Sequence, residues 1–183
     1  LAIDPLHVDL LLLWDLQTGE SLHHFPNDLA GVTDIAITPD SSTAFSSHID
    51  GTVIAWSLPN GNELFRIETE ADAIEALALS PDGQYLLMSE LFDPEGDPYT
   101  QITMWDIASM TRTAPFPDLP NYAMNHLVIS PDGATVVASS KGNADASDPL
   151  DVTDALVVAW DVSTGEERWR QTGGPQIITG IPM

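Results

Sequence analysis

Carboxylates are the most abundant side chains in this sequence that could do chemistry. The 183 residues include 28 Asp and Glu but only five Lys and Arg, which gives a formal net charge of −23. Hard oxygen ligands of this kind bind calcium when a loop brings several of them together. Two acidic segments are therefore candidates for a metal site, and their carboxylates are Asp93, Asp97, Asp145, Asp148 and Asp151.

The segment that begins at Asn143 has the alternating oxygen ligands of a calcium-binding loop, but it departs from that pattern. Asn143, Asp145 and Ser147 alternate, whereas Asp148 occupies the place of the glycine that the sharp turn needs. The twelfth position is Asp154 rather than the bidentate glutamate. We interpret both acidic segments as solvated loops, and we predict no metal site.

Catalytic side chains are not arranged in any recognisable pattern. Adjacent His23 and His24 would point to opposite faces of a strand, and no serine stands in a Gly-x-Ser-x-Gly context. The chain has no cysteine, which excludes disulfides and thiolate zinc sites. The five histidines show no metal-ligand spacing, and they are His7, His23, His24, His48 and His126. We predict no catalytic residue and no cofactor.

The charge also limits the partners. Duplex nucleic acid and anionic membranes repel so acidic a surface, so we expect neither. The longest apolar run, Leu10 to Trp14, is too short to span a bilayer. A protein partner of basic character fits the charge, whereas general solubility or a high-salt proteome would explain it without a partner. The compartment stays open.

A repeat gives the elements that would position these residues. Its markers are a tryptophan and a Pro-Asp turn, and the intervals from each Trp to the next turn proline are 25, 25 and 26 residues. The tryptophans are Trp14, Trp56, Trp105 and Trp160, and the turns are Pro39-Asp40, Pro81-Asp82 and Pro131-Asp132.

Short apolar strands enter and leave each turn, and a third strand ends at each tryptophan. A small polar turn and a more polar fourth strand follow, as in Asn62 to Glu68. Four short strands in roughly 42 residues are typical of a β-propeller blade. We predict an all-β propeller segment of four-stranded antiparallel blades, with a partial blade made of third and fourth strands (1–28), three complete blades (29–70, 71–120 and 121–173) and the first strand of another (174–183).

Taken together, Ser80-Pro81-Asp82-Gly83, Trp105-Asp106 and Thr164-Gly165 resemble the WD40-repeat family. The family often carries a Gly-His pair before the first strand; this sequence has none, and His48 and His126 lie elsewhere in the repeat. We therefore expect its His, Ser/Thr, Asp, Trp hydrogen-bond tetrad to be incomplete, with Asp50-Gly51 and Trp56 preserving part of it. The resemblance implies a divergent repeat of bacterial type and a non-catalytic scaffold for protein–protein interaction within a larger protein.

The repeat spacing places Ile178, Ile181 and Met183 in a first strand just before another turn. The remainder of the propeller would then lie in the same, longer chain. In the alternative, Ile178 to Met183 joins Val8 to Phe25 in one blade and closes a four-bladed ring, with Leu1 to Ile3 as a poor second strand.

Two insertions precede third strands, because the turn proline and the next Trp are separated by 17, 24 and 29 residues in successive blades. The inserted loops are 91–100 and 141–153. Both emerge where second strands connect to third strands, at the end of the propeller that often binds partners in this family. The predicted partner-binding residues are Asp93, Glu95, Asp97, Tyr99, Asp145, Asp148 and Asp151.

Two rival functions remain. The segment from Ala159 to Gly165, followed by Trp169, is similar to the repeat of quinone-cofactor propellers, which would make the protein an enzyme or an assembly factor. We favour surface or inter-blade packing for Trp169. The other rival is a sensor arm fused to a kinase, protease or nucleotide-hydrolysing domain.

Overall fold

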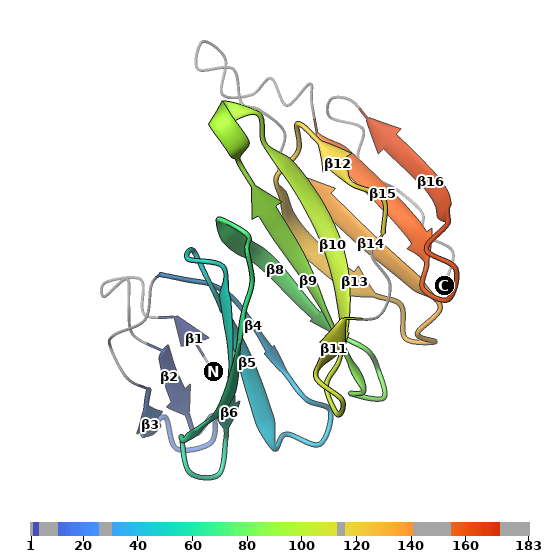
Figure 1. The fold of residues 1–183 in the computed structure, drawn as a ribbon. Coiled ribbons are helices and arrows are strands. Elements are labelled where there is room, and N and C mark those ends of the chain that lie inside the picture. The colour runs from blue at the N-terminus through green and yellow to red at the C-terminus, as the bar shows by residue number, and fades with distance from the viewer. Residues whose placement is uncertain (1, 4–10, 26–30, 113–115, 141–154, 173–183) are drawn as a thin grey trace.

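The computed structural model describes residues 2–3, 11–25, 31–112, 116–140 and 155–172. These residues form four antiparallel sheets whose strands follow one another in chain order, so the predicted all-β architecture of four-stranded blades is confirmed (Figure 1). No helix among the described residues has the length and apolar character to span a bilayer.

The first and second blades precede residue 70. The first blade holds β1 (Ala2–Ile3), β2 (Leu11–Trp14) and β3 (Ser21–His24). The second blade holds β4 (Val32–Ile37), β5 (Thr43–His48), β6 (Thr52–Ser57) and β7 (Glu63–Glu68). In the first blade Ala2 pairs with Leu12, so this sheet has three strands rather than the third and fourth strands alone.

The third blade holds β8 (Ala73–Leu79), β9 (Tyr85–Phe92), β10 (Tyr99–Asp106), β11 (Thr111–Arg112) and β12 (Leu119–Pro120). Both β11 and β12 pair with β10, so two short pieces make up the fourth strand. The fourth blade holds β13 (Met124–Ile129), β14 (Thr135–Ser140), β15 (Leu156–Asp161) and β16 (Glu167–Thr172). The further strand predicted in 174–183 lies outside the described residues.

The three Pro-Asp turns have one hydrogen-bond pattern. In the third blade the Ser80 hydroxyl donates to Asp82 (2.6 Å), and Asp82 accepts the backbone N–H of Gln84 (3.0 Å). The second and fourth blades repeat both bonds at their equivalent positions. Gly83 has φ +72°, and Ser41 takes the same left-handed conformation at φ +58° in the second blade, where the sequence lacks that glycine. Side-chain hydrogen bonds thus set the turn in all three blades.

Apolar side chains fill the space between successive sheets, which lie face to face (Figure 1). Trp56 points from the second blade toward the first and meets Phe25 edge-on, with ring centroids 5.1 Å apart. Trp160 points from the fourth blade toward the third and packs on Phe116. Burying Trp56 and Trp160 between sheets removes a large apolar area from water, and Trp105 is partly buried between the second and third blades.

Candidate functional site

The predicted 91–100 insertion is a longer hairpin with a short tip rather than a ten-residue loop. Strands β9 and β10 each run for eight residues, whereas β5 and β6 have six. Leu91 pairs with Thr100 and Phe92 pairs with Tyr99 inside the sheet. Only residues 93–98 lie beyond the strands, and Pro94–Gly96 forms a single 3-10 turn (η1) there. We call residues 93–98 the hairpin tip (Figure 1).

The base of the hairpin tip is rigid. The rings of Phe92 and Tyr99 stack with centroids 4.9 Å apart and an interplanar angle of 9°. The Thr100 hydroxyl donates to the backbone carbonyl of Tyr122 (2.6 Å), and the Asn121 N–H donates to the carbonyl of Pro98 (2.8 Å). Tyr99, a predicted partner-binding residue, is therefore half-buried in the stack and supports the tip.

Carboxylates surround the hairpin tip. Asp93, Glu95 and Asp97, three of the predicted partner-binding residues, are all exposed. Asp72, which the sequence reasoning missed, accepts the backbone N–H of Asp93 through Oδ2 (2.7 Å). Its place just before β8 could have indicated it, because fourth-to-first connections emerge at the same end as second-to-third connections. Four exposed carboxylates thus lie on or directly beside one protruding turn.

The other predicted members of this surface, Asp145, Asp148 and Asp151, lie outside the described residues, as does the whole 141–153 loop. Among the residues that are described, no three His, Cys, Asp or Glu side chains are close enough to hold a metal ion.

A buried hydrogen-bond chain in the second blade overturns one expectation. The Trp56 indole N–H donates to Ser46 Oγ (2.8 Å), which in turn bonds His48 Nε2 (2.9 Å). All three side chains are buried. His48 therefore supplies, from the end of β5, the histidine that we expected the network to lack. It can do so because residues 46 and 48 point to the same face of a strand as the paired tryptophan.

His48 also acts on Asp50 in the tight turn that follows. Burial works to raise the pKa of Asp50, but hydrogen bonds from Thr52 and the charge of His48 outweigh it and lower that pKa. His126, the other histidine that we placed outside the network, is exposed on β13.

The same network is interrupted in the next two blades. Counting from the turn proline, Ser46 corresponds to Met88 in the third blade and to Ala138 in the fourth. Neither side chain offers a hydroxyl, and the buried indole N–H of Trp160 has no hydrogen-bond partner among the described residues. A buried donor without an acceptor costs stability.

Glu90 occupies the position of His48 in the third blade. Its side chain is only 3% exposed; it accepts a hydrogen bond from Thr103 (2.6 Å) and faces the Arg112 guanidinium at 3.6 Å. Burial raises the pKa of Glu90 despite that hydrogen bond and that charge, because the ionised carboxylate loses water.

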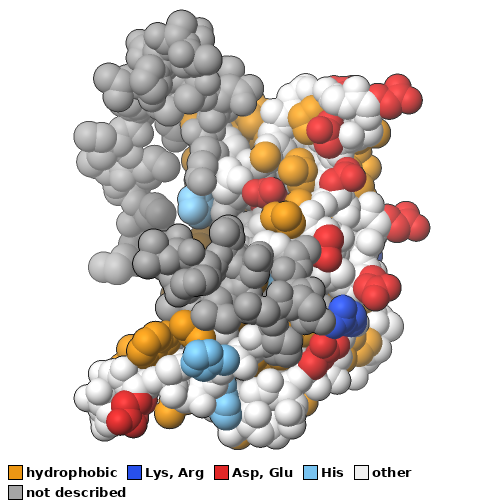
Figure 2. Space-filling model, turned by 90° about the vertical axis from the view of Figure 1, so that its left-hand side faces the viewer, with side chains coloured by type: hydrophobic (Ala, Val, Ile, Leu, Met, Phe, Trp, Pro, Cys, Tyr) orange, Lys and Arg blue, Asp and Glu red, His pale blue; other side chains and the backbone are white. Residues whose placement is uncertain are grey.

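The opposite end of the blades is also acidic. Six of the described aspartates occupy turns there, where first strands connect to second strands and third strands to fourth strands. They are Asp15, Asp40, Asp82, Asp106, Asp132 and Asp161. Hydrogen bonds lower the pKa of each of these carboxyls. For Asp161 the largest contribution comes from the Arg168 side chain, and for the other five it comes from groups within the turn. Figure 2 shows carboxylates spread over the described part of one face, with little basic surface between them.

Two large apolar side chains are exposed on the outer face of the fourth blade. Val128 is 58% exposed and Trp169 is 44% exposed. Strand pairing gives Trp169 the position of Phe65, and Val128 that of Ala36. In the second blade both of those side chains pack against the third blade. Trp169 thus occupies an inter-blade packing position, and the equivalent residues in the first and second blades are His23 and Phe65 rather than tryptophan.

The family model of the "WD domain, G-beta repeat" matches residues 19–57. That stretch holds the first three strands of the second blade and the Ser46, His48 and Trp56 network. Residues 19–57 carry one WD40 repeat. This confirms the resemblance drawn from the turn and tryptophan spacing, whereas the bacterial type stays a prediction.

Similarity to known proteins extends beyond that repeat. The small ribosomal subunit protein RACK1 of Schizosaccharomyces pombe is 26% identical over 137 residues, which cover 72% of this chain and 38% of RACK1. "Centriole proteome protein 16" of Chlamydomonas reinhardtii is 29% identical over 75 residues, which cover 41% of this chain and 3% of that protein. The chain thus spans well under half the length of these relatives.

A solved structure agrees on the fold. The hydrazine synthase of Kuenenia stuttgartiensis superposes with a TM-score of 0.72 over 90% of this chain and 43% of its own, at 17% identity. At that identity the likeness concerns the arrangement of the blades and not the chemistry.

Proposed function

We propose that this chain is part of a larger WD40-repeat propeller that acts as a non-catalytic scaffold and presents the hairpin tip to a basic segment of a protein partner. The observation that carries the proposal is the exposure of Asp93, Glu95 and Asp97 on one protruding turn, with Asp72 bonded to the backbone of that turn. The repeats and the similarity to RACK1 support a protein-interaction role.

Rigidity favours binding at the hairpin tip. The stacked Phe92 and Tyr99 rings hold the ends of the tip, and the Asp72 side chain holds the backbone N–H of Asp93. A partner that binds here does not have to order a flexible loop first, which lowers the entropy cost of association. The net charge of −23 adds long-range attraction for a basic partner and raises the rate of encounter.

The exposed apolar side chains on the outer face of the fourth blade support the larger propeller. Val128, Val157 and Trp169 have the positions that the third blade covers on the second blade. We propose that a further blade of the same chain packs here through the same positions. The energetic reason is the apolar area that would otherwise stay in contact with water.

A site-specific photo-crosslinker in the full-length protein tests the partner surface. Incorporation at Glu95 is compared with incorporation at Glu166, an exposed acid in a turn at the opposite end. We expect a captured protein specific to Glu95. With that protein purified, Asp93→Asn/Asp97→Asn should weaken binding, whereas Glu20→Gln/Glu166→Gln, which removes the same charge elsewhere, should not. If both pairs of substitutions weakened binding equally, the effect would come from net charge alone, and the hairpin tip would not be the binding surface.

Cysteine labelling tests the outer face. A thiol introduced at Val128 in the full-length protein should react slowly, because the next blade covers it. A thiol at Leu64, which is 52% exposed in the second blade, is the matched control and should react at the rate of a free thiol. Equal rates at the two positions would show that no blade packs on this face.

A further inference from the structure

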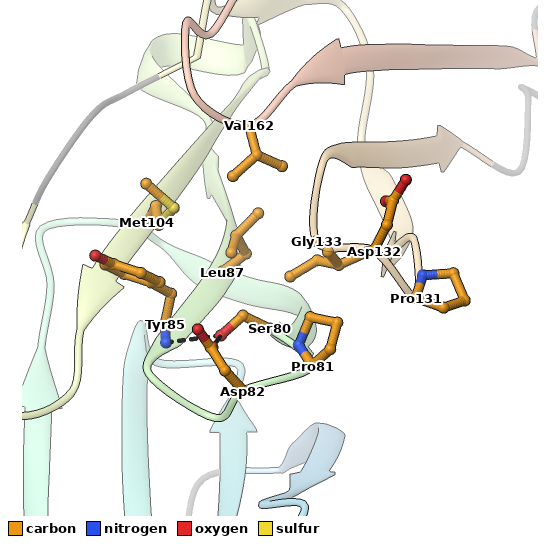
Figure 3. A pocket seen from close by; sticks show the side chains of 11 residues that line it. Ser80, Pro81, Asp82, Tyr85, Leu87, Met104, Pro131, Asp132, Gly133 and Val162 are labelled. Carbon is orange, nitrogen blue, oxygen red and sulfur yellow. Dashed lines mark hydrogen bonds between the residues drawn. The ribbon is translucent and has the colours of Figure 1, made fainter.

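A pocket lies between the third and fourth blades, at the end of the molecule away from the hairpin tip. Its volume is about 260 Å³. Leu87, Met104 and Val162 form an apolar interior, and the turns at Pro81-Asp82 and Pro131-Asp132 flank it (Figure 3). Leu87 and Met104 are buried in the third blade, so the pocket is open at the turns and closed toward the core.

The pocket has a local cause in the sequence. Leu87 takes the position that Phe45 has in the second blade, six residues after the turn proline, and is the smaller side chain. The turns are also further apart here. A Cβ atom added to Gly133 would lie 3.8 Å from Pro81 Cδ, whereas one added to Gly83 would lie 3.1 Å from Pro39 Cδ.

Two carboxylates stand at the rim. Asp82 and Asp132 are exposed, and each accepts a hydroxyl hydrogen bond from the serine of its own turn, Ser80 (2.6 Å) or Ser130 (2.5 Å). These bonds lower the pKa of both carboxyls, so both are ionised at neutral pH. Arg168 is the nearby cation, but its guanidinium is already bonded to Asp161 (2.7 Å) and Thr135 (2.6 Å).

We propose that this pocket binds the side chain of a lysine or arginine from an extended segment of a partner protein. The apolar interior suits the methylene stem, and the rim carboxylates face the cationic head, which stays near water. An anionic group would meet two fixed negative charges and is disfavoured. The chain's excess of acids attracts a segment rich in lysine or arginine to this end. The pocket is a second site, independent of the hairpin tip.

The proposal is tested by titrating a peptide into the full-length protein and monitoring the NMR chemical shifts of the backbone amides. The probe is acetyl-Gly-Gly-Lys-Gly-Gly-amide, and the same peptide with norleucine in place of lysine keeps the stem and removes the charge. We expect the lysine peptide to shift the amides of Gly83 and Gly133 in a saturable way. Asp82→Asn/Asp132→Asn should weaken it roughly two- to fivefold, as for exposed charge pairs. Asparagine keeps the oxygen that accepts the turn hydrogen bonds.

Filling the pocket provides the second variant. Leu87→Phe places the side chain of the second blade at this position and should weaken the lysine peptide by at least about tenfold, because the stem loses its apolar contact. Asp40→Asn/Asp106→Asn removes two charges at the same end but outside the pocket and should leave binding unchanged.

Two results would overturn the proposal that this pocket binds a cationic side chain. The first is equal affinity for the lysine and norleucine peptides, which would make it a purely apolar site. The second is equal weakening by the two Asp→Asn pairs, which would show that general charge attracts the peptide. Should Leu87→Phe fail to fold, the norleucine comparison and the Asp→Asn pairs still decide the outcome.

Discussion

The indole N–H of Trp56 donates to Ser46 Oγ at 2.8 Å inside the second blade, and the next two blades keep the tryptophan but replace the serine. The same buried donor is thus satisfied in the second blade, at Trp56, and unsatisfied in the fourth blade, at Trp160. The difference is open to measurement, because the surrounding strands pair in the same register in the second and fourth blades.

Ser46→Ala should destabilise the protein by about 1–3 kcal/mol, because it strands the Trp56 donor and removes a partner of His48. Urea unfolding gives the change in free energy. Ser163→Ala is the control, because Ser163 lies in an exposed turn and its hydroxyl donates to Asp161 rather than accepting a bond from a buried group. A loss no greater than that of the control would mean that the buried network contributes nothing.

Ala138→Ser should have the opposite effect and stabilise the protein by about 0.5–1.5 kcal/mol, because it offers the buried Trp160 N–H an acceptor. The same change in a Trp160→Phe background removes the donor and should give no gain. A gain that persists in that background, or a loss in the wild-type background, would contradict the assignment of Ala138 to the serine position.

Glu90→Gln should reveal the cost of the buried carboxylate as a function of pH. Because burial raises the pKa of Glu90, protonation favours the folded state, and the contribution of Glu90 to stability declines as the pH rises above its ordinary value of 4.5. Glutamine resembles the protonated form. The free energy of unfolding of the wild type relative to Glu90→Gln should therefore fall between pH 4.5 and neutrality.

Unfolding curves measured at a series of pH values supply that comparison, with Glu70→Gln as an exposed control. Arg112 is the charged group that faces Glu90, and it limits the decline without reversing it. A difference that rises with pH would show that the pair with Arg112 outweighs burial.

Gly51→Ala should cost about 2–5 kcal/mol, the sum of a left-handed backbone and a steric clash. Gly51 has φ +78°, and an added Cβ would lie 2.2 Å from the carbonyl oxygen of Ala71. Gly19→Ala is the matched control, since its φ is +73° but nothing lies within 4 Å of the added atom. Thermal or urea unfolding compares the two, and equal losses would exclude the clash.

The sequence by itself determined the fold class. Trp14, Trp56, Trp105 and Trp160 recur at a spacing that fits one four-stranded blade, and local hydrogen bonds set each Pro-Asp turn wherever it occurs. Such patterns are visible in sequence because alternating burial along strands and turn chemistry depend on neighbours a few residues apart.

Only the tertiary structure decided which side chains meet. The sequence could not show that His48 replaces a histidine expected before the first strand, because that depends on which face of β5 turns toward Trp56. The stack of Phe92 on Tyr99 and the capture of the Asp93 N–H by Asp72 depend on strand register across the 91–100 insertion. The pocket beside Leu87 depends on the distance between two sheets. Each of these is a relation between segments far apart in the chain, and packing rather than local pattern fixes it.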